Sequence, residues 1–540
     1  FTDSFVGTDP GQAGAGTTTI SAPIVGLELD FPAGGQTTAL QPASDCGQSQ
    51  SPVQLALGSP VFTNSVSGTQ FVDAFVRASN ASDTGAGGVS PDYHVLFSGS
   101  NPVNETLSAP SDSGSVGVAQ AQGAITCGTQ GVVDGAWLRS TIENTVIPEL
   151  TSAGQVSPAS LPVFLMYNTI ACEPDPANPG KLDPTTCAAG EHVAYQTASG
   201  ATQTYAIANY QLDGLVPSLS DSETITHEMT EWVDDPFGRN TTPTWGYVGP
   251  FLNSDGSGEC LPFLEVADPL SGTATQAVGS NPAYHVPDVA FPQWFFRTAA
   301  PTAGGAFSLY GTFTSPSNAA SCPQQPISVQ ASPGDGTAII SWTEPGGGSE
   351  VDGYGVCAYP SGTTFDPADP CSPSVDIEND FFTSPTQETF SGLTDGTTYV
   401  FRVFAIRCFP SDCSGTSGDL STASLPSAAV TPEASPATTT TTEPPTTTAP
   451  TSPTTTAPTS PTTTAPPGSS SPTTSPAAPV TGARQTIVTA SAQQLAFTGA
   501  GLPLRVVAAT GAVAVLLGVL LLTITGAPGL LRRRLARQRN

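Results

Sequence analysis

The residues best suited to chemistry lie in one short segment, residues 226–232 (THEMTEW). If this segment is helical, His227 and Glu231 are four residues apart and project from the same face, where both can bind one metal ion. Glu228 lies beside them, where a general base would activate a metal-bound water. The pattern is the His-Glu-x-x-His zinc helix with its second histidine replaced by glutamate. Because carboxylate oxygen is an accepted zinc ligand, the segment predicts a metal site.

The identity of the ion and the third ligand stay open at this point. Zinc is the expected cofactor, although one imidazole and two carboxylates also suit calcium or manganese. The candidates for the third ligand are Glu265, Asp268 and His285. The helix resembles that of the glutamate-zincins, in which a downstream acid completes a His-Glu-x-x pair. The resemblance implies Glu265 as the third metal ligand and Glu228 as the catalytic base of a peptidase-like metallohydrolase.

The alternative is an amphipathic helix that carries no chemistry. His227 and Glu231 would then form a solvated or hydrogen-bonded pair. The apolar residues facing the core would be Ile225, Met229, Trp232 and Val233. The matching functional alternative is a non-catalytic surface binding or adhesion protein with at most a structural metal.

Mixed elements surround this segment. A helix is predicted from Ser220 to Asp235, because serines can cap it, acidic residues lie in its first turn and Pro236 ends it. Apolar residues recur at helical spacing over 134–150, where Pro148 is expected to shorten the helix. Residues 161–167 and 205–210 are predicted strands. Residues 1–323 are therefore predicted to form one α+β domain, zincin-like if the helix binds zinc.

Three other histidines, His94, His192 and His285, stand alone in the sequence and are expected to be structural hydrogen-bonding residues. The polar run 253–259 lacks the full spacing of an EF-hand and is expected to be a turn rather than a calcium loop.

The composition agrees with an exported protein. Asp and Glu number 44 against 14 Lys and Arg, a net charge of −30, which makes nucleic acid and anionic lipid surfaces poor candidates as partners. Ten cysteines, six before residue 323 and four after it, predict disulfides formed in an oxidising compartment. The expected short-loop pairs are Cys172–Cys187 and Cys357–Cys371. No signal peptide is visible in the sequence, and the chain begins at Phe1 without a methionine, as expected of a mature or truncated form.

The C-terminal segment, residues 495–540, contains three consecutive signals. Residues 495–499 read LAFTG, residues 506–526 are long and apolar enough for a transmembrane helix, and an arginine-rich tail closes the chain. This order resembles the cell-wall sorting signal of Gram-positive surface proteins, in the Leu-Ala-x-Thr-Gly form of actinobacteria. The resemblance implies a sortase that cleaves between Thr498 and Gly499 and joins Thr498 to peptidoglycan.

Two further units lie between these ends. Residues 433–490 are rich in Thr and Pro and are predicted to be a disordered stalk. Residues 324–432 read as short alternating strands separated by turns. The Leu-x-x-Gly-x-x-Tyr pattern at 393–399 and an early Trp342 resemble the fibronectin type III domain, an all-β sandwich with a tyrosine corner. Its ligand, an extracellular protein or polysaccharide, is not readable from the sequence.

Residues 60–320 also resemble a family of uncharacterised secreted bacterial proteins. The shared segments are 69–75, 93–96, 165–168, 227–237 and 264–270. A more distant likeness is to the plant phosphate-induced, EXORDIUM-like secreted proteins, which carry a similar His-Glu-x-x-Glu helix. Neither resemblance implies a particular activity.

Overall fold

The computed structural model describes residues 4–434 with internal gaps. The residues left out are 1–3, 33–35, 39, 41–48, 111–113, 118–129, 176–177, 179, 184–186, 212–219, 247–259, 273–274, 280–281, 316–321, 347–350, 364, 366–385, 410–416 and 435–540. The predicted sorting signal with its membrane span, the polar run 253–259 and all but the first two residues of the predicted stalk lie outside the described residues. Within the described part of the chain, no helix combines the length and hydropathy needed to cross a membrane.

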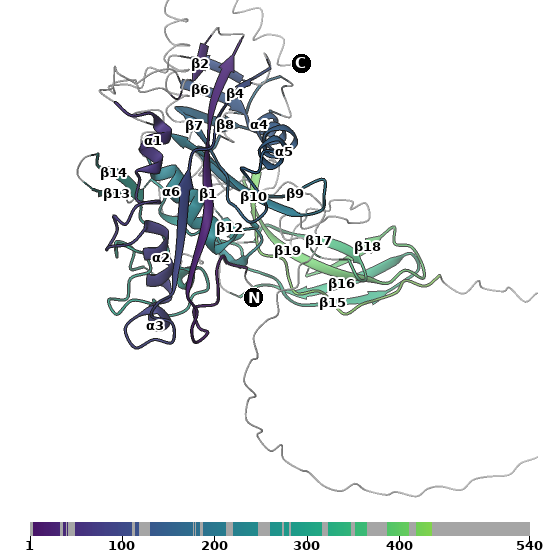
Figure 1. Ribbon diagram of the computed structural model, residues 1–540. Coiled ribbons are helices and arrows are strands. Elements are labelled where there is room, and N and C mark those ends of the chain that lie inside the picture. The colour runs from purple at the N-terminus through teal and green to yellow at the C-terminus, as the bar shows by residue number, and fades with distance from the viewer. Residues whose placement is uncertain are drawn as a thin grey trace, which may run out of the picture.

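A largely parallel sheet is the frame of the N-terminal domain (Figure 1). Its central strand is the long β1, and the strand order is β2-β1-β7-β10-β9, with β3 and β4 also paired to β1. The pairs of β1 with β3, β4 and β7, and of β7 with β10, are parallel, whereas β2 and β9 are antiparallel. The strands are β1 (Thr17–Phe31), β2 (Gln36–Thr38), β3 (His94–Ser100), β4 (Asn104–Ser108), β7 (Val163–Tyr167), β9 (Gly190–Gln196) and β10 (Thr202–Tyr210).

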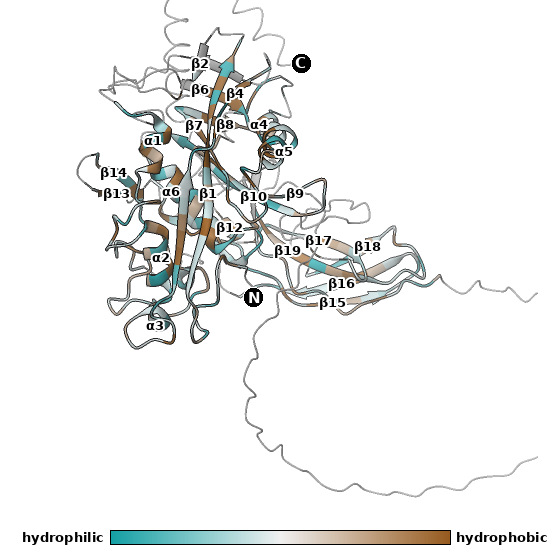
Figure 2. Cartoon of the chain, viewed as in Figure 1, coloured by the Kyte–Doolittle hydropathy of each residue, from teal (hydrophilic) through white to brown (hydrophobic). Residues whose placement is uncertain are grey.

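Helices cover both faces of this sheet. On one face lie α1 (Pro52–Leu57), α2 (Phe71–Ser79) and α6 (Glu223–Asp234), which share a hydrophobic core with the sheet. On the other face lie α4 (Gly135–Thr141), the π-helical turn η2 (Ile142–Val146) and α5 (Ile147–Ser152). Strand β7 faces both cores, since Val163 and Leu165 point to the first and Phe164 and Met166 to the second. Figure 2 shows hydrophobic residues along much of β1 at the centre.

This layering corrects the predicted class of the N-terminal domain. We expected α+β, but helices on both faces of a mostly parallel sheet make an α/β arrangement. The direction of strand pairing depends on contacts between distant segments, which the local patterns of polar and apolar residues do not encode. The helical segment 134–152 also differs from the prediction that Pro148 would shorten it. Pro148 lies in the first turn of α5, where it is tolerated because a π-helical turn precedes it, and the helical path continues beyond it.

Short elements complete this domain. They are α3 (Ala81–Thr84), β5 (Gly114–Gly117), β6 (Gln130–Asp134), β8 (Thr169–Cys172), β11 (Thr241–Gly246), β12 (Cys260–Phe263), η3 (Asp268–Leu270), β13 (Thr275–Val278), β14 (Tyr284–Pro287) and α7 (Pro292–Phe295). Between described cysteines of this domain there are two disulfides, Cys172–Cys187 and Cys260–Cys322. The first was predicted and is confirmed. Cys357 is also disulfide-bonded, and its expected partner Cys371 lies outside the described residues.

The strands after residue 326 form a separate β-sandwich, seen beside the first domain in Figure 1. One sheet has the order β15-β16-β18 and the other β17-β19-β20, all antiparallel. The strands are β15 (Ile327–Pro333), β16 (Thr337–Thr343), β17 (Gly353–Pro360), β18 (Gln387–Ser391), β19 (Tyr399–Phe409) and β20 (Ser417–Leu420). Trp342 is buried against Tyr354, with ring centroids 5.1 Å apart, and the Tyr399 hydroxyl accepts the backbone N–H of Thr394. These are the predicted core tryptophan and tyrosine corner.

Candidate metal centre

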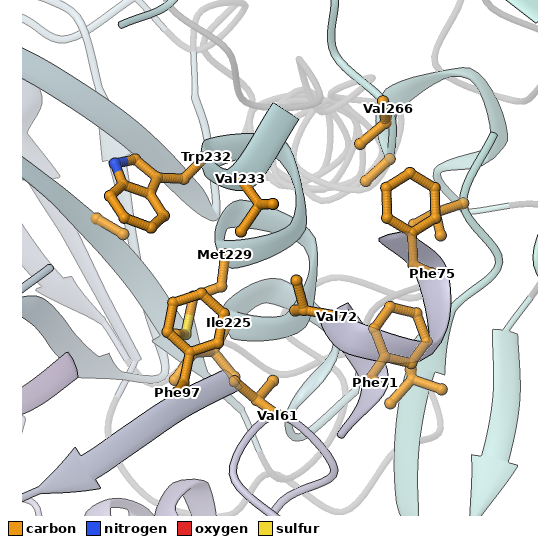
Figure 3. Close-up of a cluster of buried hydrophobic side chains, with 14 of the residues drawn as sticks. Val61, Phe71, Val72, Phe75, Phe97, Ile225, Met229, Trp232, Val233 and Val266 are labelled. Atoms are coloured by element: carbon orange, nitrogen blue, oxygen red, sulfur yellow. The ribbon is translucent and has the colours of Figure 1, made fainter. Parts of the chain in front are cut away.

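Helix α6 contains the predicted site residues His227, Glu228 and Glu231, and its apolar side is buried. It packs on β9 and β10 of the sheet, on β14 and on α2. Its apolar side chains share a core with Phe71, Val72, Phe75 and Phe97 (Figure 3). Those helix residues are Ile225, Met229, Trp232 and Val233, as the amphipathic pattern predicted.

The polar side of α6 is buried as well. His227 is 6% exposed, Glu228 2% and Glu231 0%. The solvated form of the alternative is therefore wrong, and its hydrogen-bonded form is left to weigh against a metal site. Ionised side chains are seldom buried unless a charge partner or a metal compensates them. The polar face of this helix therefore needs a group that compensates its charges.

The first group of donors surrounds the outer nitrogen of His227. The distance from His227 Nε2 to Glu231 Oε2 is 3.1 Å and to Asp268 Oδ1 is 3.2 Å. Among the described residues, no acceptor lies where an Nε2–H would make a hydrogen bond of good geometry. Two donors bound to one zinc ion at a tetrahedral angle lie about 3.4 Å apart. The spacing therefore suits three ligands of one cation.

The inner nitrogen of His227 is positioned by a hydroxyl group. Ser271 Oγ lies 3.3 Å from His227 Nδ1 and 3.3 Å from the carbonyl oxygen of Ala267. A serine hydroxyl has one proton, and if it donates that proton to the carbonyl, it accepts from Nδ1–H. The lone pair of the neutral ring then lies on Nε2, facing the two carboxylates. Histidine ligands of metals are commonly held in this way.

A second group of potential metal ligands also contains Glu231. His192, on strand β9, has its Nδ1 3.7 Å from Glu228 Oε2 and 3.8 Å from Glu231 Oε2. His192 is 3% exposed. In each group the candidate ligand atoms all lie within 4.8 Å of one another, and Glu231 belongs to both. We expected His192 to be a structural hydrogen-bonding residue, and it does hydrogen-bond the backbone of Asp235. No motif in residues 190–196 marks it as a candidate ligand as well.

The predicted third ligand, Glu265, lies near the first group but belongs to neither group. It is 1% exposed, and in the described part of the chain neither of its carboxylate oxygens has a hydrogen-bond partner. Asp268, which we also considered, lies at the start of η3 and is the residue that joins His227 and Glu231. His285 belongs to neither group. Glu231 Oε1 accepts the backbone N–H of Ala267, which ties this loop to the helix.

The electrostatics of the centre favour a cation. Burial, followed by the repulsion of neighbouring carboxylates, raises the pKa of Glu228 and Glu265 well above the usual range and that of Glu231 to about 7. Burial alone would lower the pKa of His227, but the neighbouring carboxylates hold it well above its usual value. Burial and the proximity of His227 lower the pKa of His192 to about 4. Without a cation the carboxylates must take up protons; a divalent ion would replace those protons and leave both imidazoles neutral.

The two remaining histidines are outside this centre. His94 Nδ1 lies 2.9 Å from Asp73 Oδ2, and His285 Nδ1 lies 2.6 Å from Asp221 Oδ2. Both histidines are therefore hydrogen-bonded, as predicted.

Comparison with known proteins identifies the second domain only. Residues 322–409 match the family model of the fibronectin type III domain, so this part of the chain is such a domain, as predicted. No curated protein matches the chain. Domains of this family are typical of extracellular proteins and serve in binding or adhesion, which agrees with the predicted location.

The similar solved structures each cover about a fifth of the length of this chain. The titin kinase with its flanking domains is 25% identical over 21% of this chain and 18% of its own, with a TM-score of 0.16. The FN5 domain of Drosophila Lar is 21% identical over 21% of this chain and 99% of its own, with a TM-score of 0.15. A titin module from human cardiac muscle is 23% identical over 20% of this chain and 90% of its own, also with a TM-score of 0.15.

Proposed function

We propose that this protein is an extracellular binding or adhesion protein whose N-terminal domain is stabilised by a buried divalent cation. The ligands of that cation are His227, Glu231 and Asp268, with Glu265 as a further carboxylate close by. Zinc is the expected ion, and calcium or manganese suits the same oxygen-rich set. The fibronectin type III domain is the part of the chain that supports a binding role, toward an extracellular protein or a polysaccharide.

The observation that carries this proposal is the burial of every donor. His192, His227, Glu228, Glu231, Glu265 and Asp268 are each no more than 6% exposed. A hydrolytic metal site keeps one coordination position open to water and substrate, whereas structural sites are closed by protein ligands. Helix α6 packs on β9 and β10, and the loop that contains Asp268 is hydrogen-bonded to Glu231 of the helix, which favours a closed, structural site.

A metallohydrolase is the second candidate, because of the position of Glu228. Its Oε2 has no hydrogen-bond partner among the described residues, and its carboxylate interacts electrostatically with Glu231 and Asp268, two proposed ligands of the cation. That is where a general base would be required. Opening of the centre to a substrate would be needed for this activity.

The two candidates differ in the behaviour of Glu228→Gln. For the binding protein we expect no turnover of a broad peptide library by the zinc-loaded full chain, whether wild type or variant. A hydrolase requires the wild type to cleave peptides and the variant to lose at least about 100-fold in rate, the usual contribution of a general base. An array of extracellular proteins and polysaccharides probed with the same chain should show saturable binding. Turnover that depends on Glu228, with no such binding, would overturn the proposal.

We also propose that the protein is displayed by covalent attachment to the cell wall. The support is the order of residues 495–499, the apolar stretch 506–526 and the arginine-rich tail. A sortase would cleave between Thr498 and Gly499, after the apolar stretch has held the chain in the membrane. Mass spectrometry of wall digests should then find a terminal peptide that ends at Thr498 and is linked to peptidoglycan. Recovery of an intact C-terminus through Asn540 would contradict this.

A further inference from the structure

We infer that a second divalent cation binds between His192, Glu228 and Glu231, so that Glu231 bridges two ions and Glu228 is a ligand rather than a base. This inference rests on the first cation of the proposed function and extends it to a two-metal centre. It concerns a set of residues that the helix motif does not contain, since His192 comes from strand β9.

The first step of the argument is that one ion cannot use all of the donors. Ligands on opposite sides of one zinc ion lie at most about 4.2 Å apart, because each is about 2.1 Å from the metal. The donors form two groups, each within 4.8 Å, rather than one set of five. His192, Glu228 and Glu231 form one group, and His227, Glu231 and Asp268 form the other.

The second step is the position of the shared oxygen. Glu231 Oε2 lies close to both histidines, 3.1 Å from His227 Nε2 and 3.8 Å from His192 Nδ1. The side chain of Glu231 is 0% exposed, and Oε2 has no hydrogen-bond partner among the described residues. Glu228 Oε2, on a side chain that is 2% exposed, also has none and also faces His192. Two buried carboxylate oxygens thus lie close to His192, and among the described residues neither of them accepts a hydrogen bond.

The third step is the charge of the centre. Glu228, Glu231, Glu265 and Asp268 carry four negative charges when ionised, and all four are buried. Asp235 is satisfied separately, by the backbone N–H groups of Arg239 and Asn240. With neutral imidazoles, one divalent ion leaves two buried carboxylates uncompensated, whereas two divalent ions balance all four. Uncompensated buried charge is costly, which favours the second ion.

The test is the number of ions that the full chain retains. The protein is stripped with a chelator, reloaded with zinc, freed of loosely held metal by gel filtration and analysed for zinc per chain. We expect two ions for the wild type, one for His192→Ala, one for Glu228→Gln and fewer than one for Glu231→Ala, which removes the shared ligand. His285→Ala is the matched control and should keep two, because that histidine pairs with Asp221 outside the centre.

A second measurement does not depend on the folding of any variant. Wild-type protein loaded with manganese should show the electron paramagnetic resonance signal of two exchange-coupled ions, since two-metal sites hold their ions about 3.5–4 Å apart. One zinc ion per chain with an uncoupled manganese signal would overturn the second site and leave the first intact. No retained metal in the wild type would overturn both.

Discussion

Removal of divalent cations from the full chain is expected to lower its free energy of unfolding by about 3–4 kcal/mol. An ion that binds only the folded state at 100 to 1,000 times its dissociation constant stabilises by about 2.7–4.1 kcal/mol. Once the ion has left, the buried carboxylates around helix α6 must take up protons or repel one another, so the domain should also loosen there. Calorimetry with and without a chelator measures the effect.

The chelator effect should depend on His227. Metal-loaded His227→Ala is expected to unfold as readily as the chelated wild type, and the chelator should change it no further. His94→Ala serves as the control, since His94 is bonded to Asp73 outside the centre, and it should keep the full response to the chelator. A wild type that melts at the same temperature with and without chelator would show that no cation stabilises the domain.

The substitution Gly190→Ala is expected to destabilise the N-terminal domain by about 2 kcal/mol and to reduce its metal content. Gly190 lies on β9 where the strand meets helix α6. A Cβ atom there would lie 2.6 Å from Glu228 Oε1, 2.8 Å from Glu228 Cγ and 2.7 Å from Thr224 Cγ2. Overpacking of this kind costs about 1–3 kcal/mol, because side chains and backbone must shift. His192 lies on the same strand as Gly190, two residues further along. The shift would therefore move Glu228 of helix α6 relative to His192.

The matched control for this substitution is Gly16→Ala. A Cβ atom at Gly16 meets no heavy atom within 4 Å, so its melting temperature and zinc content should equal those of the wild type. Chemical denaturation and metal analysis of both variants test the prediction. If Gly190→Ala were as stable and as rich in metal as Gly16→Ala, the close packing of β9 against α6 would not be needed for metal binding or for the stability of the domain.

The sequence by itself determined the local parts of this protein. The spacing of His227 and Glu231 places them on one face of a helix whatever surrounds it, since that relation is fixed by 3.6 residues per turn. The helix was predicted from Ser220 and begins after Ser222, whose hydroxyl donates to the carbonyl of His285. The fibronectin type III domain was also predictable, because its sequence signal is local. Its tyrosine corner joins Thr394 to Tyr399 over five residues of chain.

The tertiary structure decided everything that joins distant segments. His192 reaches α6 only because strand β9 pairs at the sheet edge next to β10 and passes under the helix. Its neighbour Glu191 points to the other side of the strand, toward Arg139, and nothing in the sequence tells the two apart. Which of Glu265 and Asp268 lies beside His227 and Glu231 also depends on the tertiary structure. They are three residues apart in a loop, and the backbone turn at η3 brings Asp268, rather than Glu265, within 3.2 Å of His227. Local spacing predicts one helix face, but the opposing donors depend on how strands and loops pack against it.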